Sequence, residues 1–175
     1  MPEFHTRLTI VGLTAIMIGV VASIIPLTIY AQQQGTNFVA TLSGKNMVPP
    51  VNTAATGTAK LHVNSNRTVS YEVDVMNING VIGAKVGLKN GTELVDLSNP
   101  YASVNHLPVF PTGQVSGVLT NGVITGNGTS LLFGPLFGKN VGDLVNLMKQ
   151  KSTYVIIRTT ANQHGEIQGQ IVPSS

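Results

Sequence analysis

Residues 68–76, TVSYEVDVM, decide the fold of this chain, because apolar and polar residues alternate along them without a break. In an extended chain, Val69 and Tyr71 point to one side, while Ser70 and Glu72 point to the other. A period of two residues predicts a β-strand with one face buried and one face toward solvent. We therefore begin from a β-strand at this position.

Segments of the same kind lie on both sides of this strand. Residues 56–63 alternate in the same way, and the turn residues Asn64-Ser65-Asn66 join the two segments as a β-hairpin. Further strands are predicted, between turn residues, at 38–43, 81–88, 93–97, 114–120, 129–133, 153–159 and 166–172. Short strands at this spacing predict an all-β sandwich or barrel.

One segment has helical spacing instead. Leu144 and Met148 recur at the interval of one face of a helix, within residues 141–149. Asn140 is a suitable N-cap, and Asp143 lies in the first turn, where a negative charge is favourable. We expect one short helix here, packed against the end of the sheets.

The stretch from residue 98 to residue 112 carries three prolines and cannot be a central strand, because proline does not donate to the hydrogen-bond ladder. It is predicted to be a long loop. Long loops in compact domains are often functional, which makes Tyr101, His106 and Phe110 candidate loop contacts. The alternative is a surface insertion without a role.

The composition limits the classes of function. A length of 175 residues suits one domain, and the absence of cysteine excludes disulfides and thiolate metal sites. Charged residues make up 10% of the chain and the net charge is only +3. The cations are scattered rather than clustered, so we expect no nucleic-acid partner, since phosphate binding requires several converging cations.

The N-terminal segment predicts export. Residues 8–29 are almost wholly apolar and follow Arg7, and Ala31 is a suitable cleavage position. Residues 1–31 are therefore a cleaved signal peptide or an uncleaved N-terminal membrane helix. Both orient the following domain, residues 37–175 after a linker at 32–36, to the outside of the membrane. We expect an extracellular or cell-surface location, with attachment to the membrane if the segment is retained.

Three N-x-S/T sequons fit an exported protein. They make Asn66, Asn90 and Asn127 candidate N-glycosylation sites. The alternative is chance, since a chain rich in Asn and Thr produces such sequons readily.

Three parts of the sequence, in order, resemble the CHRD domain, a module named after chordin and common in secreted microbial proteins. They are FVATLSG (38–44) with VPPV (48–51) and GTA (57–59), GVIGA (80–84), and YV (154–155) with GEIQGQI (165–171). The resemblance covers essentially all of residues 38–172. It implies an all-β, immunoglobulin-like Greek-key sandwich with a short helix before Tyr154.

The resemblance also implies where a metal site would lie. Many members carry a His-x-His pair just after the alanine that aligns with Ala84, and a further histidine in the strand after Tyr-Val. The aligned positions here are Lys85, Gly87 and Arg158. Because these residues are not normal metal ligands, we expect no family-type copper or zinc site. Lys85 and Arg158 are instead candidate contacts for an anion or for a partner's carboxylate, or simply solvated surface charges.

The remaining residues supply little chemistry. His62, His106 and His164 are far apart in sequence, so a shared metal site would depend on the fold. No carboxylate pair, nucleophile elbow or phosphate loop is present, and we expect no enzyme activity, no catalytic residue and no cofactor.

The sequence therefore favours a non-catalytic interaction or structural module of the cell surface or envelope. Its expected partner is another envelope or extracellular protein, or a second copy of itself. One alternative is a copper-binding or redox protein with a sandwich like that of copper–zinc superoxide dismutase. Another is a binder of small ligands or carbohydrate that uses the proline-rich loop.

Overall fold

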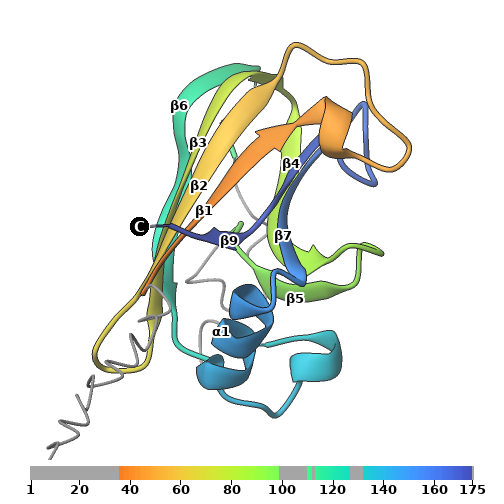
Figure 1. Cartoon of the computed structure of the whole chain (residues 1–175). Coiled ribbons are helices and arrows are strands. Elements are labelled where there is room, and N and C mark those ends of the chain that lie inside the picture. The colour runs from red at the N-terminus through yellow and green to blue at the C-terminus, as the bar shows by residue number, and fades with distance from the viewer. Residues whose placement is uncertain (1–35, 99–109, 112, 127–131, 175) are drawn as a thin grey trace, which may run out of the picture. The chain divides into compact units, whose positions relative to one another are not determined.

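The computed structural model describes residues 36–98, 110–111, 113–126 and 132–174. These residues form β-strands, one α-helix and two short 3-10 helices (Figure 1). The strands are β1 (Asn37–Ser43), β2 (Thr56–Val63), β3 (Val69–Asn79), β4 (Val81–Leu88), β5 (Glu93–Asp96), β6 (Gln114–Ile124), β7 (Thr153–Thr159), β8 (Ile167–Gln170) and β9 (Val172–Pro173). The helices are η1 (Gly44–Asn46), η2 (Gly134–Leu136) and α1 (Val141–Lys149).

The predicted all-β fold with one short α-helix is confirmed. β2, β4, β7 and α1 have the predicted bounds. The strands β3 and β6 are longer than predicted, because they pair with each other from Val69↔Ile124 to Asn79↔Gln114 across two register shifts. The predicted strand at 166–172 is two strands: β8 pairs with β7 and β1, whereas β9 pairs with β1.

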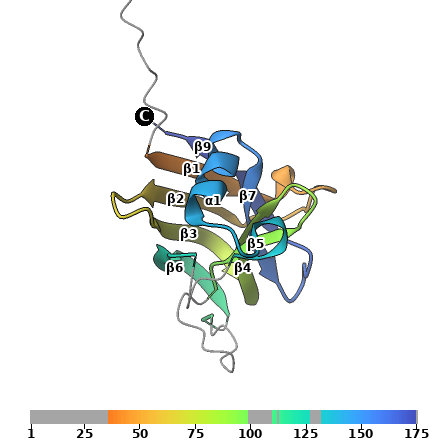
Figure 2. The same ribbon diagram turned by 90° about the horizontal axis from the view of Figure 1, so that it is seen from below.

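The strands form one sheet that folds into two layers. The order is β5-β4-β7-β8-β1-β2-β3-β6, with β9 beside β1. The two halves of this order meet only at Ser43↔Gln168, where the sheet turns from one layer to the other. Figures 1 and 2 show β1, β2, β3 and β6 side by side, facing β4 and β7.

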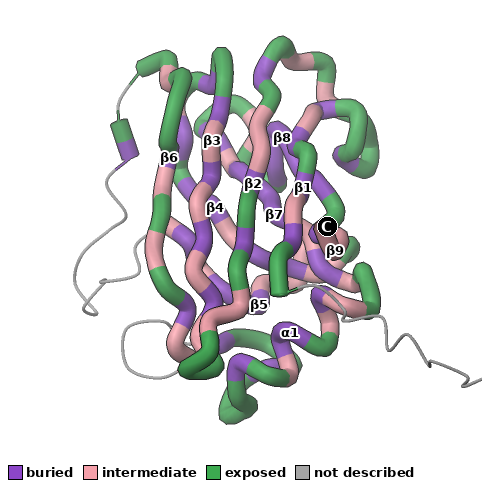
Figure 3. The backbone as a smooth tube through the Cα atoms, turned by 60° about the vertical axis from the view of Figure 1, so that its left-hand side comes forward, coloured by how far each residue is buried: buried purple, intermediate pink, exposed green. Residues whose placement is uncertain are grey.

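The core lies between the two layers. The strand that decided the fold has the predicted alternation, with Val69, Tyr71, Val73 and Val75 buried (Figure 3). Leu144 and Met148 of α1 are completely buried, so the helix covers the end of the core as expected. Asp143 begins the helix by accepting a hydrogen bond through Oδ2 from the backbone N–H of Asn140, at 3.1 Å.

Two glycines permit close approach of neighbouring backbones. A Cβ on Gly57 would lie 2.6 Å from the carbonyl oxygen of Asp74, and one on Gly169 would lie 2.3 Å from that of Thr41. Side chains cannot be accommodated at such distances without a shift of the backbone. Gly80, with a φ of 64°, makes the turn from β3 into β4.

Several predictions fall on other parts of the chain. Residues 1–31, Tyr101, His106 and Asn127 lie outside the described residues. Of the predicted strand at 129–133, only residues 132 and 133 are described, and Leu132 forms a single antiparallel bridge with Val95. None of the helices in residues 36–98, 110–111, 113–126 and 132–174 has the length and hydrophobicity of a membrane span.

Candidate functional site

Lys85, Gly87 and Arg158 lie on one face of the β4–β7 pair. The register places Gly83 opposite Arg158, Lys85 opposite Ile156, and Gly87 opposite Tyr154. Directly opposed residues of an antiparallel pair share a face, as do alternate residues along each strand. The three positions at which many family members carry histidine are therefore neighbours on the outer side of this layer.

This face carries a pocket of about 430 Å³, lined also by the loop after η1, the β4–β5 turn and the β7–β8 turn. Ile156 and Gln168 on its floor are 2% and 3% exposed, although they point away from the core between the layers. The lining residues are Met47, Val48, Lys85, Lys89, Asn90, Gly91, Ile156, Arg158, Gln163, His164 and Gln168. Three of them are cations and none is a carboxylate, so the pocket favours an anion.

Lys85 enters the pocket from β4. Its ammonium donates a hydrogen bond to the backbone carbonyl of Gly91, at 2.9 Å. Burial lowers the pKa of Lys85 below its ordinary value of 10.5, and the positive charge of Arg158 acts in the same direction. The carboxylates of Glu93 and Asp96 oppose this lowering of the pKa. A negative charge in the pocket would favour the protonated ammonium in the same way.

Arg158 enters from β7, and its guanidinium lies against Gly83. The Nε atom is buried and has no hydrogen-bond partner in the part of the chain that the structure describes. The ion pairs found among the described residues, Lys60–Glu72 and Lys60–Asp74, do not include Arg158. An unpaired buried donor is costly, because it has lost its hydrogen bonds to water without replacement.

Gly83 provides the room for this guanidinium. A Cβ at position 83 would lie 2.6 Å from Nη2 and 2.9 Å from Nε of Arg158. Any residue other than glycine would therefore push the arginine head group away from its present position.

The loop that forms one wall is held in place by hydrogen bonds. Asn46 donates through Nδ2 to the carbonyl oxygens of Thr41 and Gln168, at 3.1 and 3.0 Å. In return, Gln168 donates through Nε2 to the carbonyl oxygen of Asn46. The wall is therefore fixed relative to β1 and β8 before any ligand arrives.

A buried carboxylate fixes the other end of the same loop. Glu166 is 8% exposed and accepts hydrogen bonds from the hydroxyls of Thr53 and Thr159, each at 2.7 Å. Asn162 donates to the same carboxylate at 3.4 Å. Glu166 thus connects the loop after η1 to β7 and to the turn that precedes β8.

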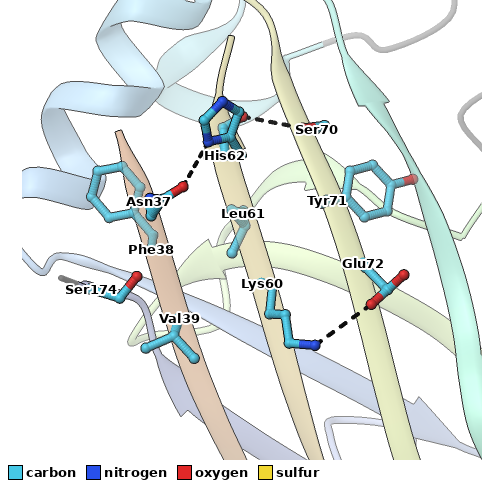
Figure 4. A pocket seen from close by; sticks show the side chains of 10 residues that line it. All are labelled: Asn37, Phe38, Val39, Lys60, Leu61, His62, Ser70, Tyr71, Glu72 and Ser174. Carbon is cyan, nitrogen blue, oxygen red and sulfur yellow. Dashed lines mark hydrogen bonds and ion pairs between the residues drawn. The ribbon is translucent and has the colours of Figure 1, made fainter. Parts of the chain in front are cut away.

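The histidines that are described do not come together. His62 is exposed on β2, with Nδ1 at 2.6 Å from Oδ1 of Asn37 (Figure 4). His164 is exposed in the turn between β7 and β8 and lines the Lys85 pocket. Across the described ranges there is no group of three or more His, Cys, Asp or Glu side chains that could hold a metal ion.

A second hollow, of about 630 Å³, crosses the outer face of β1, β2 and β3 (Figure 4). Lys60 and Glu72 face each other there, with Nζ and Oε1 3.7 Å apart. Lys60 thus forms an ion pair, whereas the salt bridges found among the described residues include neither Lys85 nor Arg158. The hollow offers no comparable charge to a ligand.

The other predicted site residues have separate positions. Asn66 and Asn90 are exposed, as a glycan acceptor must be, and Asn90 lies on the rim of the Lys85 pocket. Phe110 was a candidate loop contact, but the structure buries it in the core at 8% exposure. An aromatic ring next to proline is apolar enough to end a loop by packing inward.

Sequence reasoning paired Lys85 with Arg158 and missed the residues around them. Lys89, Gln163 and Gln168 lie in other turns and strands, and only the fold brings them to the pocket. Gly83 could have been found, since it precedes Lys85 by two residues and therefore shares its face.

Comparison with known proteins gives one family. No curated protein and no solved structure matches the chain. The model of the CHRD domain matches residues 38–171, which is most of the sequence. The resemblance of the opening and closing motifs is thereby confirmed, and the chain belongs to the CHRD domain family.

Proposed function

We propose that this chain is an exported, non-catalytic interaction module of the cell surface or envelope, which acts by binding another protein. The observation that carries the proposal is the pocket on β4 and β7, which Lys85, Lys89 and Arg158 line and to which no carboxylate contributes. Such a pocket can bind an anionic group through the cations that line it.

Export is supported by the sequence of residues 8–29 after Arg7. A domain outside the membrane, with 10% charged residues and a prearranged cationic pocket, suits contact with another surface component. If residues 1–31 are retained, the module is tethered to the membrane; if they are removed, it is released or associated with the surface.

The test is capture of partners from the native envelope. The full chain, carrying a C-terminal affinity tag, is cross-linked in intact cells and purified, and the captured proteins are identified by mass spectrometry. We expect one or a few envelope proteins in fixed proportion to the chain. Recovery of the chain without any partner would contradict an interaction function.

The alternative function, copper binding or redox chemistry, makes a different prediction. Native mass spectrometry of the protein purified without chelators would show one copper per chain in that case. We expect no stoichiometric metal, because Lys85, Gly87 and Arg158 replace the ligands that the family resemblance implies.

A further inference from the structure

The Lys85 pocket contains a half-buried guanidinium that none of the described residues engages. The Nε atom of Arg158 is buried without an acceptor, and no ion pair or hydrogen bond to the described residues holds the head group. A guanidinium has five donors in a planar fork, and proteins normally pair this fork with a carboxylate or phosphate when it leaves solvent. The missing acceptor is therefore expected from a ligand.

The edge of the guanidinium that faces Gly83 indicates the shape of that acceptor. Nε and Nη2 lie on this edge, and two such donors match the two oxygens of a carboxylate in a bidentate pair. In the structure this edge lies against Gly83, so Arg158 rotates about its side-chain torsions when Nε and Nη2 meet a ligand in the pocket. An ammonium could not make the same two parallel bonds.

Lys85 supplies the second charge. Its ammonium has three donors, and one of them is used by the carbonyl oxygen of Gly91. The remaining donors are available to an anion that also contacts Arg158, because both residues line the same pocket. With Lys89 on the same lining, the ligand meets three cations and no carboxylate of the protein.

The walls indicate that the anion belongs to a protein. Val48 is 72% exposed at the rim, and the buried residues Met47 and Ile156 line the interior. These aliphatic surfaces suit an apolar side chain beside the acidic one. A sugar acid would favour an aromatic ring for stacking, and none is among the lining residues.

We propose that this pocket is a carboxylate-binding subsite, in which Arg158 and Lys85 hold a Glu or Asp side chain of a partner protein and Val48 contacts the apolar residue next to it. The inference rests on the proposed interaction function and names the chemistry by which the partner is recognised.

A small probe tests the subsite without knowledge of the partner. The full chain, labelled with ¹⁵N and held in a neutral detergent, is titrated with N-acetylglutamate methylamide, and the Nε–H resonance of Arg158 is followed by NMR. We expect this resonance to move downfield with a dissociation constant on the order of millimolar. The neutral analogue, N-acetylglutamine methylamide, should leave it in place.

Three variants distinguish bidentate hydrogen bonding by the guanidinium from attraction by a positive charge alone. Arg158→Lys keeps the charge but removes the fork, and Gly83→Ala keeps the arginine but occupies the space beside it. Binding is followed through the backbone amides of Gly91 and Lys85. Arg158→Lys should weaken binding of the probe by about tenfold or more. Gly83→Ala, which moves the guanidinium away from position 83 but keeps its two parallel donors, should retain binding. Lys139→Gln, which removes an exposed cation outside the pocket, should bind the probe as the unaltered chain does.

Specific outcomes would overturn the subsite. These are the same response to the glutamine analogue, equal binding by Arg158→Lys, or binding of phosphate or glucuronate at least as tight as that of the glutamate probe. Thermal unfolding of each variant checks that its fold is intact. If Arg158→Lys still captures the envelope partner in full, the carboxylate subsite is contradicted and the interaction function stands. If the unaltered chain binds the probe but captures no partner, the interaction function is contradicted and the carboxylate subsite stands.

Discussion

Lys85 shows at the scale of one residue how a binding site is maintained at some cost to the fold. Its ammonium is partly withdrawn from water, next to another cation, and these two effects lower its pKa. A methionine at this position would avoid the cost. The lysine is thus better suited to binding an anion than to stabilising the domain.

The lowered pKa of Lys85 predicts a pH dependence of stability. The folded protein releases this proton at a lower pH than the unfolded chain, whose pKa is close to 10.5. Between these two pKa values the unfolded chain binds more protons, so stability rises with pH there. Below this window Lys85 is charged in both states, and the full cost of burying its charge is present.

We therefore expect the unaltered protein to gain stability relative to Lys85→Met as the pH rises toward 10.5. Urea unfolding of both proteins at a series of pH values measures the difference in free energy. Lys139→Met controls for loss of a lysine from the surface. A difference that stays constant, or that moves against the unaltered protein, would contradict the expected direction.

Glu166 is the second residue whose burial has a measurable consequence. Replacing it with alanine leaves the hydroxyls of Thr53 and Thr159 without their acceptor. We expect Glu166→Ala to lower the free energy of unfolding by about 2–4 kcal/mol, since each unsatisfied buried group costs about 1–3 kcal/mol.

Glu166→Gln is the matched variant for this test. It keeps the shape, and hydroxyls can rotate to accept as well as donate, so a smaller loss is expected. Chemical denaturation of both variants gives the comparison. Equal losses in the two would show that the shape of the side chain, rather than its hydrogen bonds, is what matters.

At the scale of elements, the contacts between strands decide which glycines are replaceable. A Cβ on Gly169 of β8 would meet the backbone of β1, whereas one on Gly83 of β4 would meet the end of a flexible side chain. Backbone in a paired strand cannot move alone, but an arginine head group can.

Gly169→Ala should therefore lower the free energy of unfolding by about 1–3 kcal/mol, as overpacking of a core does. Gly83→Ala should lower the free energy of unfolding by only a fraction of this amount, because the added Cβ meets the end of a flexible side chain. Thermal or urea unfolding measures both. Similar losses of unfolding free energy in the two variants would mean that the head group of Arg158 is held as firmly as the backbone. That result would contradict the expected freedom of the head group to move.

At the scale of the whole molecule, the fate of residues 1–31 decides how the domain is displayed. Because Ala31 follows an apolar segment of signal-peptide type, we expect the protein purified from its native source to begin at Gln32. Intact mass measurement after removal of any N-glycans tests this expectation. A mass that includes residues 1–31 would establish a membrane-tethered protein instead.

The elements of the fold were predictable where a local pattern repeats. The alternation at 68–76 and the helical spacing at 141–149 each depend on which side chains share a face, which follows from backbone geometry alone. The ends of β3 and β6 were not predictable, because their pairing continues through register shifts that no local pattern reveals.

The sequence by itself determined the all-β class, the position of the α-helix found among the described residues, and the absence of thiolate chemistry. Only the tertiary structure decided that Lys85 and Arg158 line one pocket, that Gly83 makes room for the guanidinium, and that Phe110 belongs to the core. The physical reason is that the loop after η1, the strand β4 and the β7–β8 hairpin are distant from one another in sequence. Their meeting depends on strand order, and strand order is set by burial across the whole domain.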